Sequence, residues 1–151
     1  MSNVRAEARK LVTCRPTFAT IAEDMSCNHG PMISERHFDE FIAPYYRQIV
    51  PRLQEMGAAI LVDTDGDVNR LVPWLLRESV QGVLPLERQA GVDGLALRRQ
   101  FPALRMVGHY NKMVMNQGEQ AIRAEFERLR VSLLLPFAGN KPHFRPEFTA
   151  R

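Results

Sequence analysis

The stretch Ala58-Ala59-Ile60-Leu61-Val62-Asp63-Thr64-Asp65-Gly66-Asp67 is the most informative about the fold, because a compact apolar run stops abruptly at three aspartates. Such an apolar run is typical of a strand that is buried in a parallel sheet. Gly66 then predicts a turn, and Asp67 predicts a helix N-cap, because aspartate accepts hydrogen bonds from the first helical N–H groups. The stretch therefore predicts a buried strand, a polar strand end and the start of a helix.

The same alternation of strand and helix continues on both sides of this stretch. Further short apolar runs predict strands at Thr17–Ile21, Gly82–Leu86, Leu104–Gly108 and Val131–Phe137. Helical spacing of apolar residues predicts helices at Ser34–Met56, Asp67–Leu76, Asp93–Arg99 and Glu119–Arg130. Strands that alternate with helices predict an α/β fold with an all-parallel sheet. Periodicity alone does not separate half of a (β/α)8 barrel from a small doubly wound sheet.

Three of these helices have apolar faces that we expect to be buried. In the helix after Asp67 that face consists of Val68, Leu71, Val72, Leu75 and Leu76. In the helix after Ser34 that face consists of Phe38, Phe41, Ile42, Tyr45, Ile49, Leu53 and Met56. Pro44 and Pro51 lie inside this helix and predict a kink or two shorter helices, because proline lacks the N–H group. In the helix at Glu119–Arg130 the expected buried face consists of Ala121, Ile122, Phe126 and Leu129.

Composition narrows the class of protein. The chain has 151 residues, 45% hydrophobic and 25% charged, which is typical of a soluble globular protein and short of the roughly 250 residues of a complete barrel. The net charge of +3 comes from scattered residues, so nucleic acid is not an expected partner. Cys14 and Cys27 are too few for a disulfide scaffold, and a reduced cytoplasm is the expected location. The first ten residues lack a signal-peptide core, and no apolar run predicts a membrane span.

Right-handed connections place the carboxyl ends of parallel strands at one edge of the sheet, where ligands bind in such folds. The polar residues expected there are Asp24, Asp63, Asp65, Glu87, His109, Asn111 and the loop from Phe137 to His143. Alternation along a strand end points Asp63 and Asp65 the same way, and paired carboxylates can hold a hard cation or share a proton. The alternative interpretation is structural: Asp67 caps a helix, Gly66 makes the turn, and Asp65 is solvated.

Other motif interpretations of this stretch are weaker. Asp-x-Asp-Gly also begins the phosphoaspartate phosphohydrolases, but no further phosphatase motif follows. An EF-hand is excluded because its sixth and twelfth positions hold Val68 and Trp74 instead of Gly and Glu. His and Cys do not cluster as a zinc site requires, and no Ser-His-Asp or Cys-His arrangement is legible.

A series of motifs, in order and spacing, resembles one family. The motifs are Glu23-Asp24-Met25, Asn28-His29-Gly30-Pro31-Met32-Ile33-Ser34, Phe38-x-x-Phe41-Ile42-x-Pro44-Tyr45-Tyr46, Val62-Asp63-Thr64-Asp65-Gly66-Asp67, Pro85-Leu86-Glu87, Gln89-Ala90-Gly91-x-Asp93 and Gly108-His109-Tyr110-Asn111-Lys112. Together they resemble the uroporphyrinogen decarboxylase superfamily, which also contains cobalamin-dependent methyltransferases. The resemblance covers residues 18–134.

The resemblance implies the C-terminal half of a parallel (β/α)8 barrel, with about five strands and four helices. It implies an N-terminal extension at 1–16, a partial barrel at 17–137 and a C-terminal tail at 138–151. The implied substrate is a tetrapyrrole or a corrinoid-linked molecule, with cobalamin as a methyl donor on the methyltransferase side. The implied catalytic residues are Asp63, Asp65 and His143, and no metal site is implied. The implied substrate-binding residues are Asp24, His29, Glu87, His109 and Lys112.

Departures from the family leave the reaction open between decarboxylation and methyl transfer. Where zinc-dependent methyltransferases carry His-x-Cys-Gly, this chain has Asp63-Thr64-Asp65-Gly66, whose oxygen ligands do not suit a thiol-activating zinc. The Arg- and Asp-bearing segment with which decarboxylases hold the porphyrinogen has no counterpart. The alternative function is a truncated, non-catalytic half-barrel that works through association, because open sheet edges favour homo-oligomers or aggregation.

Overall fold

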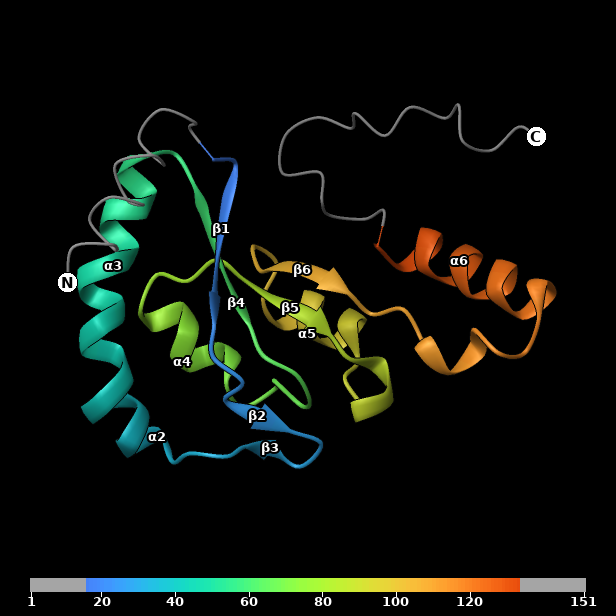
Figure 1. Cartoon of the computed structure of the whole chain (residues 1–151), viewed down its shortest axis with the longest axis horizontal. Coiled ribbons are helices and arrows are strands. Elements are labelled where there is room, and N and C mark those ends of the chain that lie inside the picture. Colours follow the sequence, from blue (N-terminus) through green and yellow to red (C-terminus); the bar gives the residue numbers. More distant parts are fainter. Residues whose placement is uncertain (1–15, 134–151) are drawn as a thin grey trace.

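A four-stranded sheet of parallel strands forms the centre of the computed structural model, which describes residues 16–133 (Figure 1). The strands lie in the order β1 (Phe18–Ala22), β4 (Ala59–Asp63), β5 (Gly82–Leu86) and β6 (Arg105–Gly108). Each neighbouring pair is parallel. The predicted α/β fold and four of the five predicted strands are therefore confirmed.

Helices connect the strands, and a short hairpin follows β1. The hairpin pairs β2 (Ser26–Cys27) with β3 (Gly30–Pro31). The helical segments are α2 (Glu35–His37), the π-helical η1 (Phe38–Ile42), α3 (Ala43–Glu55), α4 (Val72–Arg77), the 3-10 turn η2 (Arg88–Ala90), α5 (Gly94–Gln100), the 3-10 turn η3 (Lys112–Val114) and α6 (Glu119–Leu133). No helix in the described part of the chain is long and apolar enough to cross a membrane.

Strand order follows chain order, and the core lies on one face of the sheet. Alternate strand residues, among them Ile60, Val83 and Met106, join a buried cluster with side chains of α3, α4 and α5. The residues between them face the opposite side, where Phe18 of β1 is 59% exposed and Val107 of β6 is 44% exposed. Connections of one hand between strands in chain order place their helices on the same face, so the helices that join these strands within residues 16–133 leave the other face uncovered.

The helix that follows Ser34 buries only part of the face predicted from its sequence, with Ile42 and Leu53 packed against the core. Phe38 is buried as expected, but Tyr45 and Ile49 are exposed, and the inward positions are taken by Tyr46 and Val50. The cause is the π-helical turn η1, where the N–H of Ala43 donates to the carbonyl of Phe38, five residues earlier.

A π turn adds one residue to the helix, so Tyr46 and Val50 take the inner positions predicted for Tyr45 and Ile49. Pro44, in the first turn of α3, has no N–H to donate to the carbonyl four residues earlier, and the wider turn lies just before it. The break predicted for this helix is therefore found at Pro44, whereas Pro51 lies inside α3.

The last helix also differs from its prediction. Residues 131–133, predicted to begin a strand, are the end of α6, and the rest of that predicted strand lies outside the described residues. Leu129 is buried as expected, but Phe126 is 60% exposed and contacts the ring of Tyr110, with 5.2 Å between ring centroids. Glu125, directly before Phe126, is buried on α6 together with Leu129.

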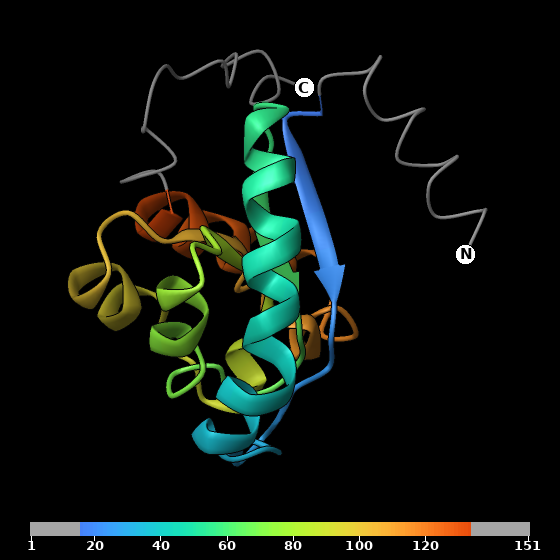
Figure 2. The same cartoon turned by 90° about the vertical axis from the view of Figure 1, so that its left-hand side faces the viewer.

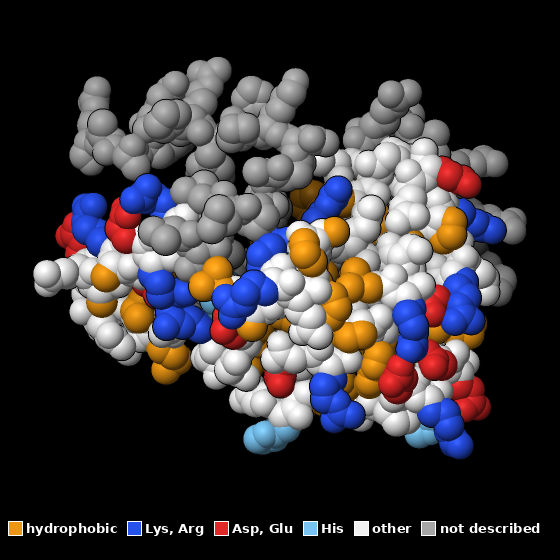
Figure 3. All heavy atoms as spheres, turned by 180° about the vertical axis from the view of Figure 1, so that it is seen from behind, with side chains coloured by type: hydrophobic (Ala, Val, Ile, Leu, Met, Phe, Trp, Pro, Cys, Tyr) orange, Lys and Arg blue, Asp and Glu red, His pale blue; other side chains and the backbone are white. Residues whose placement is uncertain are grey.

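Local signals for turns and caps agree with the structure except at Asp67. The Asp67 carboxylate accepts the N–H of Asn69 within a turn, and α4 begins only at Val72, without a side-chain cap. The Ser34 hydroxyl accepts the His37 N–H at 3.2 Å, and the Asp93 carboxylate accepts the N–H groups of Leu95 and Ala96. Gly57, predicted to end the long helix, has a positive φ of 83°. Figure 3 shows basic and acidic side chains interspersed over one face of the molecule, in agreement with the scattered charge of the sequence.

Candidate functional site

Polar residues from all four strands gather at the carboxyl edge of the sheet. Asp24 follows β1, Asp63 ends β4, and Glu87 directly follows β5. The loop after β1 is tied to β4, because the N–H groups of Glu23 and Asp24 lie 3.0 and 3.4 Å from the carbonyl oxygen of Asp63. We call the group Asp24, Asp63, Asp65, Glu87 and Lys112 the strand-end site.

Glu87 connects the ends of three strands. Its Oε2 accepts the N–H of Gly66, after β4, at 2.9 Å, and its Oε1 accepts from Lys112 Nζ, after β6, at 2.8 Å. Gln89 Nε2 also donates to Oε1 at 2.5 Å. These donors, with the Lys112 hydrogen bond the largest cause, lower the pKa of Glu87 below its ordinary value. Glu87 therefore stays ionised and anchors the site.

Asp65 has the opposite tendency. Partial loss of hydration raises its pKa first, and the negative charges of Glu87 and Asp24 raise it further. Lys112 opposes this shift, and Asp63 contributes least among these neighbours. The carboxylates that act most on Asp65 therefore belong to neighbouring strands, whereas strand alternation suggested Asp63.

Two buried hydroxyl groups hold the loop that carries Asp65. The Ser26 N–H donates to Thr64 Oγ1 at 3.1 Å, and the two hydroxyl oxygens also lie 3.1 Å apart. Ser26 Oγ donates to the carbonyl of Asp65 at 2.5 Å, and the N–H of Asp67 donates to the carbonyl of Cys27 at 2.8 Å. The hairpin after β1 thus fixes the backbone after β4.

Replacing Thr64 by valine removes the acceptor of the buried Ser26 N–H while keeping the shape of the side chain. We expect a loss of about 1–3 kcal/mol in the free energy of unfolding, because a buried donor is left without a partner. Urea unfolding measures this loss, and amide hydrogen exchange should show faster exchange at Ser26. An unchanged unfolding midpoint together with unchanged exchange would show that these hydroxyls do not hold the loop.

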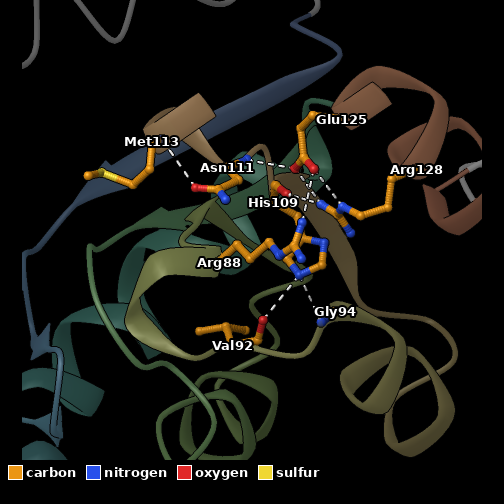
Figure 4. Close-up of polar contacts among 8 residues, drawn as sticks. All are labelled: Arg88, Val92, Gly94, His109, Asn111, Met113, Glu125 and Arg128. Atoms are coloured by element: carbon orange, nitrogen blue, oxygen red, sulfur yellow. Dashed lines mark hydrogen bonds and ion pairs between the residues drawn. The ribbon is translucent and has the colours of Figure 1, made fainter. Parts of the chain in front are cut away.

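His109 is turned away from the strand-end site. It is buried, has a positive φ of 64°, and places Nε2 3.1 Å from the carbonyl of Val92 (Figure 4). The N–H nitrogen of Gly94 lies 3.3 Å from the same Nε2, and Nδ1 is buried without a hydrogen-bond partner. Burial is the largest cause that lowers the pKa of His109, so the ring is neutral. These contacts give His109 a packing role against α5.

Next to His109 lies an ion cluster that the sequence did not reveal. Glu125 accepts hydrogen bonds from Arg88 Nη1 at 2.9 Å, from Arg128 Nε and Nη2 at 2.8 and 2.6 Å, and from the Asn111 N–H at 2.8 Å (Figure 4). These donors, with Arg128 the largest cause, lower the pKa of Glu125 to about 2. The sequence contains one indication that Glu125 is buried, because Glu125 lies at helical spacing between the apolar residues Ile122 and Leu129.

The remaining predicted residues lie apart from this cluster. His29 is exposed in the turn between β2 and β3, and His143 lies outside the described residues. Among residues 16–133, no group of three or more His, Cys, Asp or Glu side chains is arranged to hold a metal ion.

Two open hollows lie elsewhere on the surface. One, of about 390 Å³, adjoins the amino ends of β5 and β6 and is lined in part by Gln81 and Arg105. The other, of about 480 Å³, lies between α3 and α4 and is lined in part by Arg47 and Arg77. Both arginines of the second hollow already pair with carboxylates, Arg47 with Glu78 and Arg77 with Asp39. Neither hollow includes a residue of the strand-end site.

The strand-end site can accept hydrogen bonds from N–H groups and can attract positive charge, because acidic side chains outnumber the single lysine. Asp65 can also exchange a proton at a higher pH than an ordinary aspartate, since its pKa is raised. Searches of protein-family profiles, curated proteins and solved structures found no match for this chain.

Proposed function

We propose that the chain forms part of a (β/α)8 barrel of the uroporphyrinogen decarboxylase superfamily and binds a tetrapyrrole or a corrinoid-linked substrate at the strand-end site. The main support is that Glu87, after β5, accepts hydrogen bonds from the Gly66 N–H after β4 and from Lys112 after β6, and so joins three strand ends. In barrels of this kind, ligands bind at the carboxyl ends of the strands.

The arrangement of the sheet supports a barrel over a doubly wound sheet. A doubly wound sheet reverses its strand order at a switch point, and its helices cover both faces. The described strands instead keep chain order, and the core that α3, α4 and α5 build lies on one face. A barrel gives the second face an interior, which accounts for the exposed Phe18 and Val107.

The chemistry of the site fits the proposed ligands. The pyrrole N–H groups of a porphyrinogen and the amide groups of a corrinoid are hydrogen-bond donors. Asp24 and Asp65 offer acceptor oxygens, because Lys112 donates its hydrogen bond to Glu87. Ionised acceptors make the stronger hydrogen bonds, so Asp65 should bind such donors best above its raised pKa.

The reaction is tested by two assays in parallel on the full chain. One measures transfer of the methyl group from free methylcobalamin to an added thiol acceptor, and the other measures release of CO2 from a porphyrinogen. Turnover in either assay supports an enzyme of this superfamily and selects the reaction. If neither substrate turns over, both enzyme assignments fail.

Replacing Asp65 by asparagine should weaken ligand binding by about tenfold or more, because a hydrogen bond to a charged group is worth about 1.5–3 kcal/mol. Absorbance titration with a porphyrin and with methylcobalamin measures the affinity. The matched control is Glu127→Gln, which removes the same charge from the exposed face of α6. Equal affinities of the two variants would exclude Asp65 from the binding site.

A further inference from the structure

An apolar stripe runs along α3 beside the open edge of β1. Phe41, just before α3, and Tyr45 and Ile49 within it lie four residues apart and are 56%, 64% and 43% exposed. Large apolar side chains at this spacing form one continuous strip on a helix. Within the described residues β1 pairs with β4 alone, so its other edge is unpaired as well.

The stripe faces the side of α3 opposite α4. Arg47 and Gln54 mark the α4 side, because Arg47 pairs with Glu78 and Gln54 Nε2 donates to the carbonyl of Ser79. Helical residues follow each other at about 100°, so Tyr45 lies about 100° from the inward-facing Tyr46, on the side away from Arg47. In Figure 2, α4 and β1 lie on opposite sides of α3.

The other end of the sheet offers a matching surface. Within the described residues β6 pairs with β5 alone, and its Val107 is 44% exposed on the same uncovered face as Phe18. The segment that follows β6 exposes Met113, Met115 and Phe126, at 59%, 63% and 60%. At both ends of the described sheet, therefore, a strand with one unpaired edge lies next to exposed apolar side chains.

We infer that two copies of this chain close one eight-stranded barrel, in which β6 of each copy pairs in parallel with β1 of the other. The four parallel strands formed by residues 16–133 of each copy together make the eight that a (β/α)8 barrel needs. Strand order stays sequential across each junction, and the helix after β6 comes to lie beside the helix after β1. The α3 stripe of one copy then packs against the segment after β6 of the other, including Phe126. This inference rests on the barrel proposed above.

Closure changes the site as well as the oligomeric state. In one copy Asp24 and Lys112 follow the two outermost strands of the sheet. In the closed pair the end of β6 adjoins the end of the other copy's β1, so Lys112 of one copy comes beside Asp24 of the partner copy. Residues of both copies therefore form the ligand site at the carboxyl end of the barrel. A single copy supplies only part of that site.

The test is the mass of the full chain in solution, measured by light scattering during gel filtration at micromolar concentration. We expect twice the 17.3 kDa of one chain. Ile49→Glu should raise the dissociation constant of the pair by about tenfold or more, because a charge is buried at the junction. The control is Gln48→Glu, since Gln48 is exposed on the same helix. Both positions are exposed in the single copy, and circular dichroism confirms that each variant folds.

A monomer at this concentration overturns the inference, and so do open-ended assemblies larger than a pair. Equal dissociation constants for Ile49→Glu and Gln48→Glu overturn it too. The proposed function is tested separately. If the chain forms a pair that binds neither porphyrin nor methylcobalamin, the inferred pair is supported and the proposed function is rejected. If the chain is a monomer that binds one of these ligands, the proposed function is supported and the inferred pair is rejected.

Discussion

Gly66→Ala is expected to destabilise the protein far more than Gly57→Ala, although both glycines have the same positive φ of 83°. At Gly57 a new Cβ would meet no atom within 4 Å, so only the strained backbone costs energy, about 1–2 kcal/mol. At Gly66 the Cβ would lie 2.4 Å from the carbonyl carbon of Cys27, so the hairpin must move. Such a clash adds about 1–3 kcal/mol to the backbone strain, for a total of roughly 2–5 kcal/mol.

Urea unfolding of the two variants measures the difference directly, with Gly57→Ala as the control for backbone strain. The same displacement should reach the site, because the Gly66 N–H donates to Glu87. Equal losses in the two variants would mean that the loop after β4 accommodates the methyl group without displacing the hairpin.

Glu125→Gln is expected to cost about 2–4 kcal/mol in the free energy of unfolding. Removing the charge leaves Arg88 and Arg128 without their shared carboxylate at a buried position, and breaking one partner of a buried pair costs about 3–5 kcal/mol. The side chains of Arg88 and Arg128 are 38% and 29% exposed, so water compensates part of that loss. Glu127→Gln, whose carboxylate is 65% exposed, should change stability by at most about 0.5 kcal/mol.

The same carboxylate predicts a dependence of stability on pH. The pKa of Glu125 falls from an ordinary 4.5 to about 2 on folding, so the unfolded chain binds its proton at a higher pH than the folded chain does. The stabilisation is therefore complete above pH 4.5 and is lost as the pH falls towards 2. Unfolding midpoints measured across this range should fall less steeply for Glu125→Gln. Parallel curves for the two proteins would contradict the assigned role.

The sequence predicted those features that depend on neighbouring residues. The strand at Gly82–Leu86 and the cap at Asp93 are local patterns, in which a short apolar run or one side-chain oxygen is enough. The gathering of Asp24, Asp65 and Glu87 was also predictable, because parallel strands bring their carboxyl ends to one edge.

What the sequence did not predict depends on geometry between elements. The π turn before Pro44 moves the inner face of α3 by one residue, which no regular period anticipates. Glu125 lies at an apolar position of α6, but the sequence does not show which groups compensate its burial, which are two arginines and a backbone N–H. His109 was expected to bind substrate, but the backbone after β6 turns its ring towards Val92.

Amide hydrogen exchange with and without ligand can show whether a tetrapyrrole or corrinoid binds at the strand ends. A porphyrin and methylcobalamin are the two probes, and mass spectrometry locates the protected segments. If either ligand binds at the strand ends, the amides of residues 63–67 and 108–112 should exchange more slowly, whereas exchange at Glu127, on the exposed face of α6, should not change. Unchanged exchange in both segments with both ligands, or protection confined to the hollow near Gln81 and Arg105, would contradict such binding.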